Sequence, residues 1–381
     1  MRVLVLGGDG FLGWPTVLHL AAAGFEVGIF DSLARRDLDR ELGTSSLVPI
    51  ESLMNRIDAW HDAHDEWLHL YRGDTTRAGD LERALVQFGP DAVIHLAEQR
   101  SAPYSMLGSR QAAYTQRVNV IGTLNLIHAV HAVNPNIHVI KLGSLGEYGT
   151  PNLDIEEGWL DVTHKGRTDR VLYPKRPGSW YHLSKVHDSH NLEFACRAWN
   201  LRVTDLNQGV VYGVDTDQTQ RHPDLATRFD YDAIFGTALN RFAVQAALGV
   251  ELSVYGDGSQ IRGFINLRDA VRCLELACLN PAEPGEFRVF NQLTQSISIL
   301  DVAEAVASRV PGATVAHFVS DRVEEMGHHY RVTHTGLEAL GLEPHYLTNE
   351  VIDGILATAR RHLDRVNQAV IYPRLGGWHR D

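Results

Sequence analysis

Residues 3–13 read Val3-Leu-Val-Leu-Gly-Gly-Asp-Gly-Phe-Leu-Gly13. The apolar run predicts a short buried strand, and the glycines lead directly into a helical pattern at Leu12–Ala23. Glycines at this spacing provide a tight turn, let the backbone approach a pyrophosphate closely and allow the helix to pack on the strand. The helix N-terminus offers unpaired N–H groups and a positive dipole end to phosphate oxygens. The stretch therefore predicts the opening of a dinucleotide-binding fold.

The same alternation of short apolar runs and helical patterns continues for about two-thirds of the chain. Continuously apolar runs are typical of parallel strands that are buried on both faces. We therefore predict an α/β fold of the Rossmann type: a doubly wound parallel sheet with helices on both faces and a smaller C-terminal substrate-binding lobe. The remaining predicted elements of this part are strands at Glu26–Phe30, Trp67–Tyr71, Ala92–Leu96, His138–Leu142 and Arg202–Leu206, and helices at Arg77–Gln87, Ala113–Val133 and Tyr181–Trp199.

The pattern also predicts where the chain divides. Residues 1–207 are expected to form the dinucleotide-binding domain, with an insertion at 33–66. Residues 208–381 are expected to form mainly the smaller lobe, with elements that cross back to the main sheet. Residues 150–178 have little periodicity and several turn residues, so we expect a long active-site loop there. Later elements are predicted at Ala233–Leu248 (helix), Leu252–Tyr255 and Phe287–Asn291 (strands).

Composition narrows the class of protein further. The 381 residues carry a formal net charge of −12, which matches a nucleic-acid partner poorly. No apolar stretch approaches the ~18 residues that a membrane helix needs, so no membrane insertion is expected. The three cysteines have neither metal-ligand nor disulfide spacing, no histidine pattern predicts a metal site, and no targeting peptide precedes the first strand. We therefore expect a cytoplasmic location.

Asp31 stands at the end of the predicted second strand. A carboxylate at this place accepts hydrogen bonds from the adenosine ribose, which favours NAD over NADP. Arg35 and Arg36 follow closely and could instead hold a 2′-phosphate, but the charge of Asp31 would repel that group. A structural glycine turn without a cofactor is the remaining alternative. We predict NAD.

Tyr181 and Lys185, in Tyr181-His-Leu-Ser-Lys185, lie four residues apart and therefore on one face of a helix. Ser144 follows the predicted fifth strand. A free tyrosine has a pKa of about 10, but a neighbouring ammonium and a positively charged nicotinamide lower that pKa. Together with the glycine turn, these residues predict a hydride-transfer site. Tyr181 would be the acid–base, Lys185 its electrostatic partner and Ser144 a hydrogen-bond partner of the reacting hydroxyl.

The order of glycine turn, strand-end hydroxyl and Tyr-x-x-x-Lys resembles the extended short-chain dehydrogenase/reductases that act on nucleotide sugars. Within them, the chain is similar to the UDP-sulfoquinovose synthase family over nearly its whole length. The most distinctive stretches are Glu98-Gln-Arg-Ser-Ala-Pro-Tyr-Ser105 and Tyr181-His-Leu-Ser-Lys-Val-His-Asp-Ser-His190, supported by Gly146–Asn152, Asp205–Gly213 and Phe235–Phe242.

The resemblance implies UDP-glucose and sulfite as substrates and NAD as a cofactor that is regenerated in each cycle. The implied reaction is oxidation at C4, loss of water across C5–C6, addition of sulfite at C6 and reduction of C4 again, giving UDP-sulfoquinovose. A homodimer built on the helices at Ala113–Val133 and Tyr181–Trp199 is also implied. Two alternatives stay open: a UDP-glucose 4-epimerase or 4,6-dehydratase that uses no sulfite, and a non-catalytic NAD-binding sensor or scaffold.

The resemblance also implies roles for individual residues. Arg100 is the candidate cation for sulfite, and Glu147, His182 and Tyr148 are candidates for moving the C5 and C6 protons. The predicted catalytic residues are Ser144, Tyr181, Lys185, Glu147, Arg100 and His182. The predicted cofactor contacts are Gly7, Gly10, Phe11, Leu12, Gly13, Asp31, Arg35, Arg36, Asp74, Leu96, Glu98, Asn119, Tyr181, Lys185 and Gln208. The predicted substrate contacts are Arg100, Ser144, Tyr181, Gln208, Thr237, Tyr255, Gln260, Arg262 and Arg322.

Two positions depart from common patterns. The usual strand-end hydroxyl of the family is threonine, whereas this chain has Ser144, which lacks the restraining methyl group. Ordinary 4,6-dehydratases carry an acidic pair after that hydroxyl, where this chain has Leu145 and Gly146. The second departure favours the synthase over the dehydratase. It leaves open which group serves as the dehydration acid.

Overall fold

A seven-stranded sheet, parallel at every neighbouring pair, forms the centre of the computed structural model, which describes residues 1–319 and 329–372. The order reverses between β1 and β4, which confirms the predicted doubly wound class. From one edge to the other the strands are β3 (His69–Arg72), β2 (Glu26–Asp31), β1 (Arg2–Leu6), β4 (Ala92–His95), β5 (His138–Ser144), β8 (Arg202–Gln208) and β12 (Phe287–Gln292).

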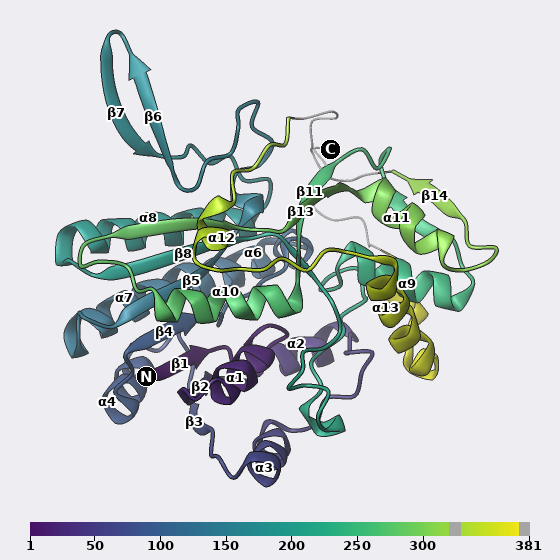
Figure 1. Ribbon diagram of the computed structural model, residues 1–381, viewed down its shortest axis with the longest axis horizontal. Coiled ribbons are helices and arrows are strands. Elements are labelled where there is room, and N and C mark those ends of the chain that lie inside the picture. Colours follow the sequence, from purple (N-terminus) through teal and green to yellow (C-terminus); the bar gives the residue numbers. More distant parts are fainter. Residues whose placement is uncertain (320–328, 373–381) are drawn as a thin grey trace.

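Helices cover both faces of this sheet (Figure 1). One face carries α1 (Gly13–Ala22) and α10 (Leu267–Leu279), and the other carries α4 (Ala78–Phe88), α7 (Gly122–Val133) and α8 (Trp180–Trp199). The central strand β1 feeds both cores, because side chains alternate between the faces of a strand. Its residues 3 and 5 lie in the core under α1, and residues 4 and 6 lie in the core under α4 and α7.

Several predicted elements end elsewhere than expected. β5 runs two residues beyond its predicted end, so Ser144 is the last residue of the strand. The helix expected at Ala113–Val133 is a continuous run of α6 (Ser109–Gln116), a π-helical turn (Arg117–Ile121) and α7. The helix expected from Ala233 begins only at Ala238, as α9 (Ala238–Leu248), because the Thr237 side chain caps it by accepting from the Asn240 N–H.

The prediction of a loop throughout residues 150–178 is wrong. This segment contains an antiparallel hairpin of β6 (Trp159–His164) and β7 (Arg167–Leu172), which projects from the body of the molecule (Figure 1). Lys165 and Gly166 form its two-residue turn with positive φ angles of 50° and 74°. Two adjacent residues with positive φ are characteristic of tight hairpin turns. The Lys-Gly pair was the available signal in the sequence.

The C-terminal part forms a second, smaller core beside the sheet. β12 returns to the main sheet and pairs with β8, as the expected crossover requires. The division at residue 207 stays a prediction. The other elements of this part are β9 (Val210–Tyr212), α9, β10 (Leu252–Tyr255), β11 (Ile261–Asn266), β13 (Gln295–Ser298), α11 (Ile299–Ser308), β14 (Val315–Phe318), α12 (Thr335–Ala339) and α13 (Asn349–Arg361).

The insertion after β2 forms two helices, α2 (Ala34–Leu42) and α3 (Leu53–His64). Fully buried Arg56 of α3 donates to Asp9 in the glycine turn over 2.8 Å. Its Nη2 donates to the Ala226 carbonyl over 3.2 Å. The insertion therefore braces the turn between β1 and α1 and joins it to the segment before α9.

Backbone crowding fixes glycine in the turn between β1 and α1. Gly7 has a positive φ of 85°, and a Cβ atom there would lie 2.8 Å from the backbone of Leu96 and Ala97. A Cβ atom on Gly13 would overlap the carbonyl oxygen of Gly7. The Gly10 N–H donates to that same oxygen over 3.1 Å. A side chain at either crowded position would have to displace backbone rather than another side chain.

We predict that Gly13→Ala lowers the free energy of unfolding by about 1–3 kcal/mol, because the added methyl group overpacks a rigid turn. Gly354→Ala is the matched control, since Gly354 lies within α13 with open space around its Cβ position. That control should raise stability by about 0.5–1 kcal/mol. Chemical denaturation of both variants is the measurement. Equal effects at the two positions would contradict the crowding argument.

Candidate active site

A cavity of about 880 Å³ lies at the carboxyl ends of the strands, between the sheet and the smaller core. Ligand sites of doubly wound folds lie at this edge, where the strand order reverses. Most of the predicted site residues line it. They are Gly7, Gly10, Phe11, Leu12, Gly13, Asp31, Arg35, Asp74, Leu96, Glu98, Arg100, Ser144, Tyr181, His182, Lys185, Gln208, Thr237, Tyr255, Gln260 and Arg262.

One end of the cavity fits a dinucleotide. Gly7, Gly10 and Gly13 of the glycine turn line this end, and the N-terminus of α1 faces it. The Asp31 carboxylate accepts from the N–H groups of Asp9 over 2.9 Å and Leu33 over 2.6 Å. Burial raises the pKa of Asp31, while these two hydrogen bonds oppose the rise. The donors hold the carboxylate at the place where an adenosine ribose could bind.

The two arginines of the insertion are already paired. Arg36 donates to Asp9 over 2.6 and 2.8 Å, and it does not line the cavity. Its contact with a cofactor stays a prediction. Arg35 lines the cavity, pairs with Asp39 and Asp230, and lies 3.7 Å from the centre of the Phe235 ring. Neither guanidinium is left unpaired to hold a 2′-phosphate, which agrees with the preference for NAD over NADP.

Tyr181 and Lys185 share one face of α8 at the floor of the cavity. The Lys185 Nζ lies 5.9 Å from the centre of the Tyr181 ring and donates to the Leu142 carbonyl over 2.5 Å. The same ammonium forms an ion pair with Glu98, whose side chain is 2% exposed. Glu98 thus contacts Lys185 directly in addition to lining the cavity, a role that the sequence did not indicate.

The surrounding protein does not make the phenol of Tyr181 acidic. Burial raises its pKa above the ordinary value, Lys185 opposes that rise, and the carboxylates of Glu98 and Glu147 add to it. The expectation of a lowered pKa counted Lys185 and a positively charged nicotinamide, but it omitted burial and Glu98. A positive charge from a bound ligand is therefore needed before Tyr181 becomes a base near neutral pH.

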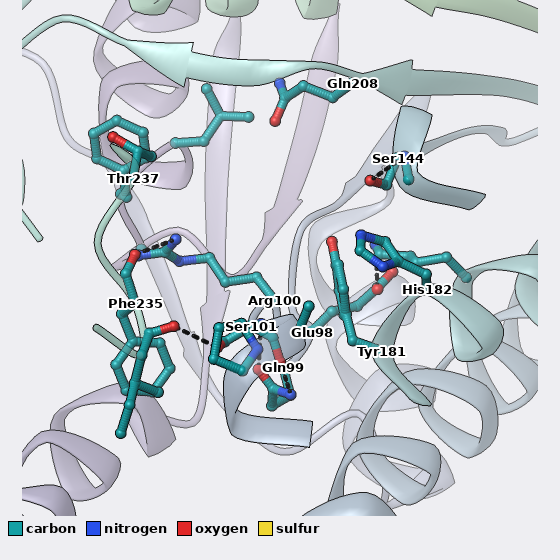
Figure 2. Close-up of a pocket in the computed structure, with 18 of the residues that line it drawn as sticks. Glu98, Gln99, Arg100, Ser101, Ser144, Tyr181, His182, Gln208, Phe235 and Thr237 are labelled. Atoms are coloured by element: carbon teal, nitrogen blue, oxygen red, sulfur yellow. Dashed lines mark hydrogen bonds and ion pairs between the residues drawn. The ribbon is translucent and has the colours of Figure 1, made fainter. Parts of the chain in front are cut away.

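Ser144 and His182 lie on the cavity wall beside Tyr181, and Figure 2 shows the Tyr181 side chain directed toward that side. The Ser144 Oγ accepts from the Gly146 N–H over 3.2 Å, which orients a hydroxyl that lacks the methyl group of threonine. The His182 Nδ1 lies 2.9 Å from the Ser179 Oγ. Gly146 is required here because a Cβ atom would overlap the His182 ring.

Glu147, which the sequence predicts to move a substrate proton, lies in a buried ion-pair cluster beside the cavity, so its catalytic role stays a prediction. Its side chain is fully buried, does not line the cavity, and lies 3.4 Å from the Nζ of Lys141 and 2.5 Å from that of Lys175. Although burial alone would raise it, these ammonium groups lower the pKa of Glu147 to about 2. Tyr148 is buried as well, and its hydroxyl bonds to Asn207 and Asn291. Both side chains are held by partners within the protein.

Asn119 was predicted as a cofactor contact, but it is buried in the π-helical turn and does not line the cavity. Its Oδ1 accepts from the Gln99 N–H over 2.8 Å, and its Nδ2 donates to the Gln99 carbonyl and the Ser184 Oγ. The asparagine thereby ties the segment after β4 to α8. A direct contact between Asn119 and the cofactor stays a prediction.

Arg100 points toward the smaller core, where it forms an ion pair with Asp230 and donates to the Phe235 carbonyl over 3.2 Å (Figure 2). Although burial alone would raise it, Arg35, Arg228 and Arg100 lower the pKa of Asp230 to about 2. The candidate cation for sulfite thus has a carboxylate partner. Sequence patterns missed Asp230, because it is far from Arg100 along the chain and belongs to no motif.

The far end of the cavity is walled by the smaller core. The Gln208 amide donates to Gln292 over 2.8 Å, the Gln260 amide donates to the Tyr255 carbonyl over 3.0 Å, and Arg262 donates to the Ile261 carbonyl over 2.9 Å. The predicted contact Arg322 lies outside the described residues. Four further residues of the cavity wall were not predicted from the sequence, because no local motif marks them: Arg176, Arg241, Tyr330 and Tyr372.

Other classes of site find no support in the part of the chain that the structure describes. Residues 1–319 and 329–372 contain no group of histidine, cysteine or acidic side chains arranged to hold a metal ion. Among those same residues, no helix combines the length and apolar character required to cross a membrane.

Comparison with known proteins agrees with this geometry. The model of the NAD dependent epimerase/dehydratase family matches residues 3–291. The chain therefore belongs to this family of NAD-dependent enzymes. The UDP-glucose 4-epimerase of Thermotoga maritima, solved with UDP-glucose, shares the fold with a TM-score of 0.70 at 21% identity, over 95% of this chain and 100% of that one.

Two relatives narrow the assignment. The chain is 51% identical to the chloroplastic UDP-sulfoquinovose synthase of Spinacia oleracea, over 98% of this chain and 78% of the relative. It is 41% identical to the UDP-sulfoquinovose synthase of Sulfolobus acidocaldarius, over 90% of this chain and 88% of the relative. Within the larger family, the chain belongs with the UDP-sulfoquinovose synthases.

We predict that Glu147→Gln lowers the free energy of unfolding at pH 7 by about 3–5 kcal/mol, because it leaves buried Lys141 and Lys175 without their shared carboxylate. The pKa of Glu147 is depressed on folding, so its stabilisation is complete above the ordinary carboxyl pKa and is lost as the pH falls toward about 2. The difference between variant and wild type should therefore shrink below about pH 4.5 in denaturant titrations. A difference independent of pH would contradict this assignment.

Proposed function

We propose that the protein converts UDP-glucose and sulfite into UDP-sulfoquinovose, with NAD regenerated in each cycle. The observation that carries the proposal is the 51% identity to a named synthase over 98% of the chain, together with Ser144, Tyr181 and Lys185 on one cavity. A non-catalytic sensor has no use for this trio. The alternative of a structural glycine turn without a cofactor loses its basis as well, because the chain belongs to a family of NAD-dependent enzymes.

The oxidation at C4 assigns roles to three side chains. Bound NAD supplies a hydride acceptor, and later a hydride donor, for carbon 4 of the hexose. Tyr181 takes the proton of the 4-hydroxyl and later returns it, Ser144 hydrogen-bonds the oxygen at C4, and Lys185 holds its charge against the Tyr181 ring. Ser144 and Lys185 already have orienting hydrogen bonds, so little rearrangement is required for these two groups to act.

The C4 ketone acidifies the proton on C5, which permits loss of water across C5–C6. Sulfite then adds to C6 of the conjugated enone. With Glu147 and Tyr148 enclosed elsewhere, His182 is our candidate for moving the C5 and C6 protons, because it lies on the cavity wall next to Tyr181. A histidine is suited to both directions of transfer near neutral pH.

We propose that the cavity-lining residues predicted from sequence keep their roles in binding. On the cofactor side these are Gly7, Gly10, Phe11, Leu12, Gly13, Asp31, Arg35, Asp74, Leu96, Glu98, Tyr181, Lys185 and Gln208; on the substrate side they are Arg100, Ser144, Tyr181, Gln208, Thr237, Tyr255, Gln260 and Arg262. Arg100 remains the candidate for sulfite, since 37% of its side chain is exposed, although Asp230 already offsets its charge.

A homodimer is part of this proposal. Ile121, Leu124 and Phe194, on the continuous helix ending in α7 and on α8, expose 44%, 37% and 54% of their surface. In the proposed dimer, these two helices of each protomer form a four-helix interface. A cytoplasmic location is also proposed, and the free, buried thiols of Cys196, Cys273 and Cys278 are consistent with a reducing compartment.

Incubation of the protein with UDP-glucose and NAD, with and without sulfite, tests the reaction. We expect a nucleotide sugar in which sulfonate replaces the 6-hydroxyl, only when sulfite is present, by mass spectrometry. UDP-galactose or a 4-keto-6-deoxy sugar as the sole product would refute the synthase and indicate an epimerase or dehydratase.

We predict that Tyr181→Phe reduces turnover by about 10²–10⁴-fold while the affinities for NAD and UDP-glucose stay within about threefold, because the ring remains and only the transferable proton is lost. Calorimetric binding and steady-state rates provide the comparison. Tyr173→Phe is the control, since Tyr173 is buried away from the cavity and should leave turnover unchanged. Unchanged turnover in Tyr181→Phe would remove this residue from the mechanism.

A further inference from the structure

The pair formed by Lys185 and Glu98 is enclosed by protein and lies beside the reacting tyrosine (Figure 2 shows Glu98 and Tyr181). The side chains of Lys185 and Glu98 are 4% and 2% exposed. A hydride-transfer site of the kind predicted here requires an ammonium beside the phenol, but it does not require a carboxylate against that ammonium. The Glu98 carboxylate weakens the lowering of the Tyr181 pKa by the Lys185 ammonium. Its presence therefore needs an explanation.

The charges around this pair are otherwise balanced. From β5, Lys141 is matched by Asp205, at 3.2 Å, and by Glu147, which also pairs with Lys175. Lys141 also donates to the Lys185 carbonyl over 3.2 Å. The His182 ring of α8 lies 4.9 Å from the Tyr181 ring, centre to centre, and the Leu142 carbonyl accepts from Lys185.

Two further titratable groups lie near the pair. His95, at the end of β4, lies 3.7 Å from Glu98, and burial lowers its pKa to about 4. Asp188, one turn after Lys185 on α8, is fully buried with no hydrogen-bond partner among the described residues. Burial raises the pKa of Asp188 well above its usual range, which favours the neutral form of this carboxyl. Glu98 is the carboxylate in direct contact with the Lys185 ammonium, and it therefore offsets the charge of Lys185.

We propose that Glu98 is a positioning residue that cancels the charge of Lys185, so that Tyr181 releases its proton only when a cationic group of a ligand lies against the pair. The inference rests on the proposed function in taking Tyr181 and Lys185 as the acid–base pair. The oxidised nicotinamide is cationic and the reduced one is neutral, so the carboxylate links the proton on Tyr181 to the redox state of the bound cofactor.

This link suits a reaction with a long interval between its two redox steps. In the proposed sequence the proton taken from the 4-hydroxyl must remain on Tyr181 while water leaves and sulfite adds. An uncompensated ammonium at Lys185 would favour loss of that proton throughout the interval. With Glu98 in place, the proton is retained for the return of hydride to C4.

Binding of the two cofactor forms, without sugar or sulfite, tests the inference independently of the reaction. In the wild-type protein, calorimetry in buffers of different ionisation enthalpy should show proton release between about pH 7 and 8 on binding NAD⁺ and none on binding NADH. Equal proton uptake or release for the two forms would overturn the inference. This measurement needs no variant, and it can fail while the sulfite assay succeeds.

In Glu98→Gln, the ratio of the Kd for NAD⁺ to the Kd for NADH should rise on the order of tenfold, since a buried negative charge near the cationic ring is lost. The Tyr181–Lys185 pair should also release its first proton at lower pH, measured by tyrosinate absorbance against a Tyr181→Phe background. Glu98→Asp, which keeps the charge, should restore the ratio to within about threefold of the wild type.

Asp188→Asn is the matched control, because it changes a second buried carboxyl on the same helix, one that has no hydrogen-bond partner among the described residues. Its ratio of dissociation constants should equal that of the wild type. A Glu98→Gln protein that binds both forms more weakly by the same factor would reduce Glu98 to a structural contact. If Asp188→Asn raised the ratio as Glu98→Gln is expected to do, the proposal would have assigned the negative charge to the wrong residue.

Discussion

The reversal of strand order between β1 and β4 is the constraint on which the rest of the structure depends. On either side of this point the connections leave the sheet toward opposite faces, so the carboxyl ends of the central strands stay uncovered. The glycine turn forms one wall of the resulting cavity. The backbone of Leu96 and Ala97 packs closely against Gly7. The smaller core then roofs the same opening and converts an edge of the sheet into an enclosed site.

Burying charged side chains around the cavity costs free energy, and ion pairs between them offset this cost. Asp9 is satisfied by Arg36 and Arg56, Asp230 by Arg35, Arg100 and Arg228, and Glu147 by Lys141 and Lys175. Removing one partner from such a cluster leaves a buried charge without compensation, whereas intact clusters fix orientation. These clusters hold the turn, the segment before α9 and the strand-end serine in place around the cavity.

Lys185 is also paired with a buried carboxylate, but it lines the cavity beside Tyr181. Its ammonium is offset by Glu98, so the phenol of Tyr181 is governed by burial until a ligand brings its own charge. The site is therefore tuned for a reaction in which one proton is held through several steps. An enzyme that only oxidised its substrate would gain from a permanently acidic phenol.

The sequence by itself determined the fold class, the glycine turn, the position of Asp31 and the spacing of Tyr181 and Lys185. These features are local, because turn geometry and helical periodicity are set by residues close together in the chain. Only the tertiary structure decided which charged groups face the cavity. Glu147 and Arg36 looked like site residues from their motifs, yet each is held by partners that the fold brings from elsewhere. The neutralisation of Lys185 by Glu98 was equally hidden, since a pKa depends on burial and on every nearby charge, and these are known only once distant segments have packed together.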